Sequence, residues 1–523
     1  MNILRSIVGA ILVSISLPAL AQKTVSKLPG EYWWGGQTAR YNDMPFEEGF
    51  EADLSTDYGA QVQTLLLSNK GRYIWSEKPF SFKVDKYDIV LSEQDGYVIG
   101  QEGKSLATAQ QYAAENFLHQ GSKAPLKSIA QLPQYDLVTE LGIGLNQATV
   151  LHYANQLIEE EQPAGILHFG DRWNKYYGDF SFDEGRYPDP IDMIKKLHEL
   201  GFEVVVDVAP FVSPDSEEFR SLDKEHDAFL KDALDPEEIK IVKWEKGYSA
   251  LLDLSKPDIQ SWLESKLNRT RKKYGVDGFK LLGGSLEHFS DVVAAESSDS
   301  HDLVTAYAKI GLSQKMAFLG PGMQMGGYPL VRSLPTQELT WGTLGSVIDA
   351  VALQGIMGYP YSEVSFYRDN ANPRDSIDQE LIIRAFQLQA FMPSMAALPI
   401  PSVLLDEDHK AAYKKALAIR TELGSQITKL ANRAASSGVP LVQTMEYAFP
   451  DKGYIDIHDQ FLLGKDYLVA PILEANQDKK EITFPKGNWL SPEGKVYIGP
   501  TKETLKVDLD DVLYFRKVFF REQ

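Results

Sequence analysis

The sequence is 523 residues long, which allows about three domains of ordinary size or one large barrel with appended domains. Hydrophobic residues make up 43% and charged residues 24%, values that exclude a disordered chain and a multi-span membrane protein. The 53 basic and 73 acidic side chains leave a net charge of −20, which repels phosphate, so we expect no nucleic-acid partner. Cysteine is absent, which excludes disulfides and thiolate metal sites.

The N-terminus has the features of a signal peptide. Arg5 precedes an apolar run over residues 7–15, Pro18 follows it, and Ala19-Leu20-Ala21 has the small-x-small pattern of a cleavage site. We expect residues 1–21 to be removed after Ala21 and the protein to be exported to a bacterial periplasm or the extracellular medium. The alternative is a membrane anchor, but the run is shorter than the roughly 20 residues that span a bilayer, so we expect no membrane span in the mature chain.

Short β-like runs dominate residues 22–125. They cover residues 32–36, 60–67, 72–75, 80–84 and 87–91, separated by turn residues, and a helical stretch over 105–121 follows. This pattern predicts an N-terminal β-sandwich.

Between residues 126 and 433 the pattern changes to buried strands that alternate with helices. The predicted strands include residues 165–169, 203–208, 278–282 and 316–320, and predicted helices cover 148–160, 190–200, 256–274 and 378–389. Repeated βα units over about 300 residues predict an α/β fold with an eight-stranded (β/α)8 TIM barrel. From 434 to 523 β-runs return at 440–447, 461–472, 480–484, 495–498 and 512–516, which predicts a C-terminal β-sandwich.

In such barrels the functional groups follow the carboxyl ends of the strands. Asp171 and Trp173 follow the strand that ends at residue 169, Glu287 follows the strand that ends at residue 282, and Tyr361 and Glu363 stand near strand seven. Carboxylates that grip hydroxyl groups and aromatic faces that stack on rings suit a carbohydrate ligand. His168 and His288 lack further ligands at zinc-site spacing, and the glycines at 320–322 and 326–327 lack a phosphate-loop context, so we expect no metal and no cofactor.

Several stretches together resemble glycoside hydrolase family 31, the α-glycosidases, over nearly the whole mature chain. They are residues 66–76, 178–190, 210–216, 274–280, 459–464 and 468–471. The resemblance implies the same sandwich, barrel and sandwich order and a carbohydrate substrate. It also implies substrate contacts by Asp171, Trp173, Lys280, Arg332, Trp341 and Tyr361.

The departures from the family pattern fall on its reactive groups. The family places an aspartate nucleophile two residues after the lysine of the strand-four motif, and Leu282 stands there. The acid/base aspartate is expected between Arg332 and Trp341, where residues 333–340 contain no aspartate. Three further expected groups, two aspartates and an arginine, are replaced by Gly170, Ser365 and Gln443.

Two hypotheses follow. Retaining glycosidases of this type need two carboxyl groups about 5–5.5 Å apart, and Leu282 can neither attack a sugar nor donate a proton. The first hypothesis is therefore a catalytically impaired protein that binds an α-linked saccharide. The alternative is an active α-glycosidase that uses relocated carboxylates, for which Glu287, Glu338 and Glu363 are the candidates. Whether the chain is an enzyme stays open at this point.

Overall fold

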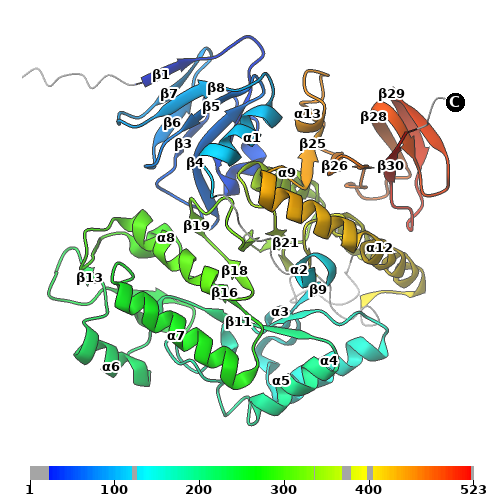
Figure 1. The fold of residues 1–523 in the computed structure, drawn as a ribbon. Coiled ribbons are helices and arrows are strands. Elements are labelled where there is room, and N and C mark those ends of the chain that lie inside the picture. Colours follow the sequence, from blue (N-terminus) through cyan, green and yellow to red (C-terminus); the bar gives the residue numbers. More distant parts are fainter. Residues whose placement is uncertain (1–22, 120–126, 335, 368–377, 397–403, 520–523) are drawn as a thin grey trace, which may run out of the picture.

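The computed structural model describes residues 23–119, 127–334, 336–367, 378–396 and 404–519. The predicted signal peptide, residues 1–21, lies outside the described residues. Figure 1 shows an N-terminal β-part in blue, a central α/β part that begins in cyan and continues through green and yellow, and a C-terminal β-part from orange to red. None of the described helices is long and apolar enough to cross a membrane.

The N-terminal part consists of two sheets with a buried core between them. One has the order β1 (Lys23–Ser26), β7 (Asp88–Leu91), β6 (Ser81–Val84) and β3 (Glu51–Asp53). The other contains β4 (Gln61–Ser68), β5 (Arg72–Trp75) and β8 (Val98–Gln101), and β2 (Trp33–Gln37) also pairs with β4. Leu65, Leu67, Phe82 and Ile89 are at most 3% exposed. Helix α1 (Leu106–Asn116) follows, capped by Ser105.

The central part is the predicted barrel. Its strands, in chain order, are β9 (Pro133–Asp136), β10 (Ile166–His168), β11 (Glu203–Val208), β16 (Gly278–Leu281), β18 (Ala317–Leu319), β20 (Val331–Ser333), β22 (Ser362–Glu363) and β24 (Met395–Ala396). Each pairs in parallel with the next through β22, and β24 pairs back with β9. Among the described residues no pairing joins β22 to β24. The four strands predicted at 165–169, 203–208, 278–282 and 316–320 are confirmed to within two residues.

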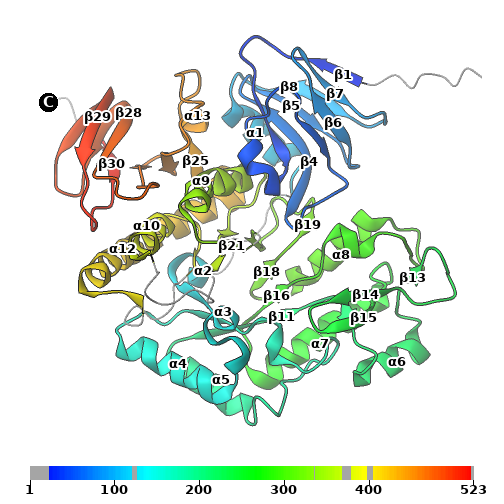
Figure 2. The same ribbon diagram turned by 180° about the vertical axis from the view of Figure 1, so that it is seen from behind.

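Helices surround this sheet in the expected alternation, and Figure 2 shows α4, α5, α7 and α8 along its outside. They are α3 (Leu137–Leu141), α4 (Gln147–Glu159), α5 (Pro190–Glu199), α7 (Pro257–Tyr274), α8 (Ser300–Ile310), α9 (Trp341–Ile356), α10 (Gln379–Gln389) and α12 (Glu407–Ser437), and α2 (Lys127–Gln131) precedes β9. The connection from β11 to α7 carries an insertion with α6 (Glu217–His226), β12 (Phe211–Val212), β13 (Lys231–Asp232), β14 (Ile241–Trp244) and β15 (Gly247–Leu251); β13 pairs with β17 (Val292–Val293).

Strand five departs from the βα rule, because a strand follows it in place of a helix. This strand, β19 (Gly322–Met323), pairs in parallel with β4 of the N-terminal part. The Gln61 side chain also donates to the carbonyl of Gly320. The N-terminal part is therefore joined by hydrogen bonds to the loop after strand five.

The C-terminal part is a β-domain, as expected, and its described strands form one antiparallel six-stranded sheet. They are β25 (Val442–Thr444), β26 (Phe461–Leu463), β27 (Tyr467–Val469), β28 (Lys479–Leu490), β29 (Val496–Lys506) and β30 (Tyr514–Val518). The run at 440–447 is only partly a strand, because Thr444 caps the short helix α13 (Met445–Ala448). The run at 461–472 is split into β26 and β27 by a turn at Gly464, whose φ is 62°.

Candidate functional site

Polar side chains line the inside of the barrel at the carboxyl ends of its strands. Asp207 and Lys280 are direct partners in neighbouring parallel strands, so their side chains point to the same face. Lys280 meets Glu363 from strand seven, which places that face on the barrel interior. The register adds Asp136, His168, Ser333 and Leu282 to the same face. Barrel interiors are ordinarily filled with branched aliphatic residues, so this layer is a candidate functional site.

A buried ion pair crosses the barrel. Lys280 Nζ lies 3.2 Å from Glu363 Oε2, and the Glu363 side chain is only 4% exposed. Ser333 donates a short hydrogen bond to the same oxygen. Burial alone would raise the pKa of Glu363, but Lys280, His168 and the Ser333 hydroxyl outweigh it and lower that pKa. Glu363 is therefore held ionised.

Asp207 has the opposite environment. Burial raises its pKa to about 7 against the opposing effect of Lys280, and Asp136, Asp171 and Glu363 add to the increase. Its Oδ1 atom is buried and has no hydrogen-bond partner among the described residues. Asp207 thus changes its charge near neutral pH, unlike Glu363.

His168 is neutral in this site. Its Nε2 atom lies 2.9 Å from Gln134 Oε1, and its ring meets Phe318 edge-on with a centroid distance of 4.8 Å. Burial lowers its pKa to about 4 despite the nearby Glu363. Within the described residues no group of three or more His, Asp or Glu side chains is arranged to hold a metal ion.

Position 282, where the family resemblance places the nucleophile, carries an aliphatic side chain in the barrel. Leu282 is partly buried, and its amide donates to the carbonyl of Val208 at 2.8 Å. Since side chains alternate along a strand, Leu282 faces inward together with Lys280. The interior therefore lacks a carboxylate at this position.

The three candidate carboxylates lie in different environments. Glu363 is inside the barrel, as described above. The Glu287 side chain is 78% exposed and lies 3.9 Å from His288. Glu338 is exposed on β21 (Gln337–Glu338), which pairs with β23 (Phe366–Tyr367). Only Glu363 of the three belongs to the polar layer.

Asp171 and Trp173 lie on the loop after strand two. Asp171 Oδ2 accepts a hydrogen bond of 2.7 Å from the hydroxyl of Tyr177. Trp173 is fully buried, and its indole N–H donates to the backbone carbonyl of Asp207 at 2.7 Å. Trp173 thus fixes this loop against strand three, close to the polar layer.

Arg332 and Trp341 lie away from the inward face, whereas Tyr361, two residues before Glu363, is on the same face of strand seven as Glu363. Arg332 alternates with the inward Ser333, is fully buried, donates to the carbonyl of Met325 at 2.9 Å and covers the ring of Tyr359 at 4.9 Å. Tyr361 is also fully buried. Trp341 donates from its indole to Asp378 and lines a groove of about 500 Å³ that faces the C-terminal sheet. The structure therefore brings Lys280 and Glu363 together with residues that we had not singled out.

Asp207 and Ser333 are members of the site that the sequence did not predict. Asp207 lies within a run of valines that predicts a buried strand, and its charge is the one signal that distinguishes it. Ser333 was noted only as part of an interval without aspartate. A carboxylate inside a buried parallel strand is rare enough to indicate a functional position.

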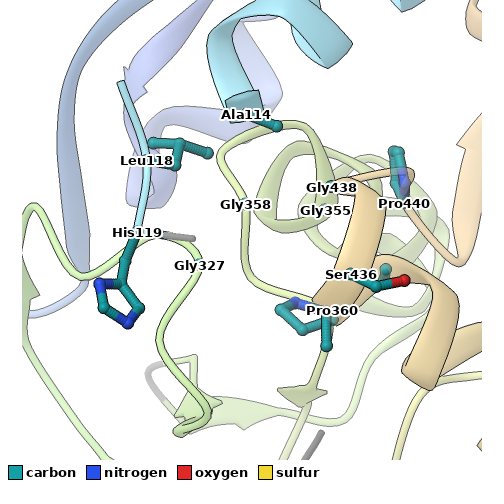
Figure 3. A pocket seen from close by; sticks show the side chains of 12 residues that line it. Ala114, Leu118, His119, Gly327, Gly355, Gly358, Pro360, Ser436, Gly438 and Pro440 are labelled. Carbon is teal, nitrogen blue, oxygen red and sulfur yellow. The ribbon is translucent and has the colours of Figure 1, made fainter. Parts of the chain in front are cut away.

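A separate small pocket lies outside the barrel interior. It is bordered by Leu118, His119, Gly327, Gly358 and Pro360 (Figure 3). Its volume is about 20 Å³, which is enough for about one water molecule and too small for a sugar ring.

Two parts of the chain match the models of two domains from one protein family. Residues 134–307 match the TIM-barrel domain of glycosyl hydrolases family 31, and residues 438–522 match the C-terminal domain of the same family. The chain belongs to glycosyl hydrolase family 31. It is 28% identical over 432 residues to the mouse protein named myogenesis-regulating glycosidase, covering 79% of this chain and 60% of that protein.

Other family 31 proteins are more distant in sequence and similar in fold. Alpha-glucosidase 2 of Bacillus thermoamyloliquefaciens is 23% identical over 70% of this chain and 50% of its own length, so the chain spans 50 to 60% of these relatives. A Flavobacterium johnsoniae family 31 dextranase, solved with glucose, superimposes with a TM-score of 0.82 at 17% identity, covering 95% of this chain and 66% of that chain. A soil-metagenome α-xylosidase, solved with xylose, has a TM-score of 0.81 at 19% identity, covering 95% and 79%.

Proposed function

We propose that this glycosidase-like protein is exported, binds an α-linked saccharide at the carboxyl end of its barrel and has lost retaining hydrolysis. The observation that carries the proposal is the inward-facing Leu282 at the position of the family nucleophile. Retaining hydrolysis needs a carboxylate there to form the covalent glycosyl intermediate, and an aliphatic side chain has no nucleophilic atom.

The rest of the polar layer supports a binding role. Asp207, Lys280 and Glu363 are costly to bury, and a barrel with a merely structural interior gains nothing from them. Structural neighbours of the same fold have been solved with glucose and with xylose. The family relationship therefore favours a saccharide as the ligand. The signal-peptide pattern of residues 1–21 supports export.

One observation favours the alternative, an active α-glycosidase. Asp207 and Glu363 have pKa values shifted in opposite directions, and such pairs supply the acid and the base in many hydrolases. In that case Asp207 would donate a proton and Glu363 would act as the ionised partner. However, Glu363 is already engaged by Lys280 and Ser333, which favours the binding function.

Binding and hydrolysis assays on the purified chain from residue 22 onward distinguish the two functions. We expect saturable calorimetric binding of at least one α-linked sugar from a panel of glucosides, xylosides, galactosides and isomaltotriose, with no product from the corresponding aryl α-glycosides. Hydrolysis that is abolished by Glu363→Gln but not by Glu287→Gln or Glu338→Gln would establish the alternative. The two exposed glutamates serve as matched controls, because they carry the same substitution outside the polar layer.

A further inference from the structure

We propose that Asp207 replaces the aspartate missing at position 170 as a sugar-contacting carboxylate, and that a saccharide hydroxyl donates a hydrogen bond to its ionised form. This inference rests on the proposed saccharide binding at the barrel mouth. It assigns a ligand contact to a residue of strand three and implies that sugar binding releases a proton.

The Asp207 carboxylate lies close to the position of the side chain that is missing at residue 170. A Cβ atom built on Gly170 would lie 4.0 Å from Asp207 Oδ2, so this carboxylate borders the space into which a side chain at 170 would project. That Cβ would also come within 2.3 Å of Val138 Cγ2, and Gly170 has a φ of 63°. The loop therefore has no room for an aspartate at 170, and the carboxylate from strand three lies beside the position that such a side chain would take.

The Asp207 carboxylate lacks a hydrogen-bond donor among the described residues. No described residue donates a hydrogen bond to its side chain, although Asp171 and Glu363 each have one donor or more. Its Oδ1 atom is buried and unpartnered, while the residue as a whole is partly exposed. An ionised carboxylate without a donor is unfavourable, and a ligand hydroxyl would supply the missing hydrogen bond.

Several titratable groups surround Asp207. Lys280 stands on the adjacent strand β16, and the neutral His168 on the adjacent strand β10. Asp136 of β9 and Glu363 of β22 face the same interior from strands farther along the sheet. Asp171 follows β10 and adds a negative charge near Asp207. Lys246 lies in the turn between β14 and β15, close enough to Asp207 for the carboxylate to act on the pKa of Lys246. The phenol groups of Tyr177, on the loop after β10, and of Tyr307, on α8, also lie near Asp207 and are neutral. Burial is the main cause that raises the pKa of Asp207 to about 7; the adjacent lysine opposes it and the three carboxylates add to it, so Asp207 is about half protonated near pH 7.

The consequence is a linkage between binding and protonation. If the sugar binds only the ionised form, then the proton leaves the Asp207 carboxyl for the solvent on binding and no covalent bond forms to the sugar. The apparent affinity follows the ionised fraction, which is about one tenth at pH 6 and about nine tenths at pH 8 for a pKa of about 7. We expect affinity to rise about tenfold between these pH values and to level off above them.

Calorimetry of the full mature chain tests the linkage. The tightest-binding sugar of the panel of methyl α-glycosides and isomaltotriose is titrated at pH 6, 7 and 8, at each pH in two buffers of different ionisation enthalpy. We expect release of about half a proton per sugar at pH 7. Binding with equal affinity at all three pH values and no proton release would overturn this inference and leave saccharide binding intact. No binding by any sugar would overturn both.

Two variants test whether Asp207 is the group that releases the proton. Asp207→Asn should abolish the pH dependence and weaken binding at pH 8 about tenfold, because the ionised acceptor is gone. Asp136→Asn is the matched control, because it removes one neighbouring negative charge and asparagine still caps α3. It should keep the proton release but move it to lower pH. Unchanged proton release in Asp207→Asn would assign the proton to another group. The wild-type measurement is decisive even if a variant fails to fold.

Discussion

Lys280→Met is expected to destabilise the protein by about 3–5 kcal/mol, since it leaves the Glu363 charge buried without its cation. The Glu363 side chain is 4% exposed, so water cannot replace the ammonium group. Ser333 remains as a single donor to the carboxylate. Urea unfolding midpoints of the wild type and the variant at pH 7.5 measure the loss.

Two comparisons make this prediction specific. Lys502→Met removes a surface ion pair with Glu481 whose partners are 64% and 59% exposed and 2.9 Å apart, and it should cost less than about 1 kcal/mol. The double variant Lys280→Met/Glu363→Leu should recover part of the loss, because the uncompensated charge is gone. A Lys280→Met variant that is as stable as Lys502→Met would contradict the buried ion pair.

The pH dependence of that variant has a defined sign. In the wild type the pKa of Glu363 is lowered, so the carboxylate contributes stability above its unfolded pKa and loses it as pH falls. Without Lys280 the effect of burial dominates, and the folded pKa of Glu363 moves above its unfolded value. The stability difference between the variant and the wild type should therefore shrink toward acid pH, where protonation removes the charge.

Arg420→Met is expected to cost about 3–5 kcal/mol, because one buried guanidinium satisfies carbonyl groups from two chain segments. Arg420 on α12 is 1% exposed and donates to Ala130 at 2.6 Å on one side and to Ala390, Met392 and Pro393 on the other. Ala130 precedes strand one and residues 390–393 precede strand eight, so Arg420 fixes the approach to both strands. Burial lowers its pKa to about 9, which still leaves it charged at neutral pH.

Matched variants separate this role from a general effect on α12. Arg433→Met replaces an exposed arginine of the same helix and should change the unfolding midpoint little. Arg420→Lys keeps the charge but lacks the planar group with donors on both sides, so we expect an intermediate loss. An Arg420→Met variant with the stability of Arg433→Met would contradict the account.

The barrel could be predicted from the sequence because its long central strands are nearly continuous apolar runs, such as residues 203–208. Strands seven and eight contain two residues each, which is too short for any periodic pattern. The helical α13 was missed because the hydroxyl of Thr444 caps a helix within a run that suits a strand. Local capping thus overrides the apolar pattern.

The candidate site could be predicted only in part. The family resemblance selected Lys280 and the proximity to strand seven selected Glu363, but neither indicates that the two side chains meet across the barrel. The register between strands decides which side chains face the barrel interior. Asp207 and Arg332 both lie on strands, so the sequence alone could not show that Asp207 faces inward and Arg332 does not. The exposure of Glu287 and Glu338 likewise depends on loops whose path the sequence does not fix.

The most direct test of the central claim is to restore a carboxylate at position 282. Leu282 is partly exposed and faces the barrel interior, so Leu282→Asp should fold. α-Glycosyl fluorides need no acid to expel fluoride, which isolates nucleophilic attack from proton donation. We predict that the wild type releases no fluoride above background, whereas Leu282→Asp releases it and forms a glycosyl adduct that mass spectrometry detects on residue 282. Enzyme-dependent fluoride release by the wild type at the rate of Leu282→Asp would contradict the loss of hydrolysis.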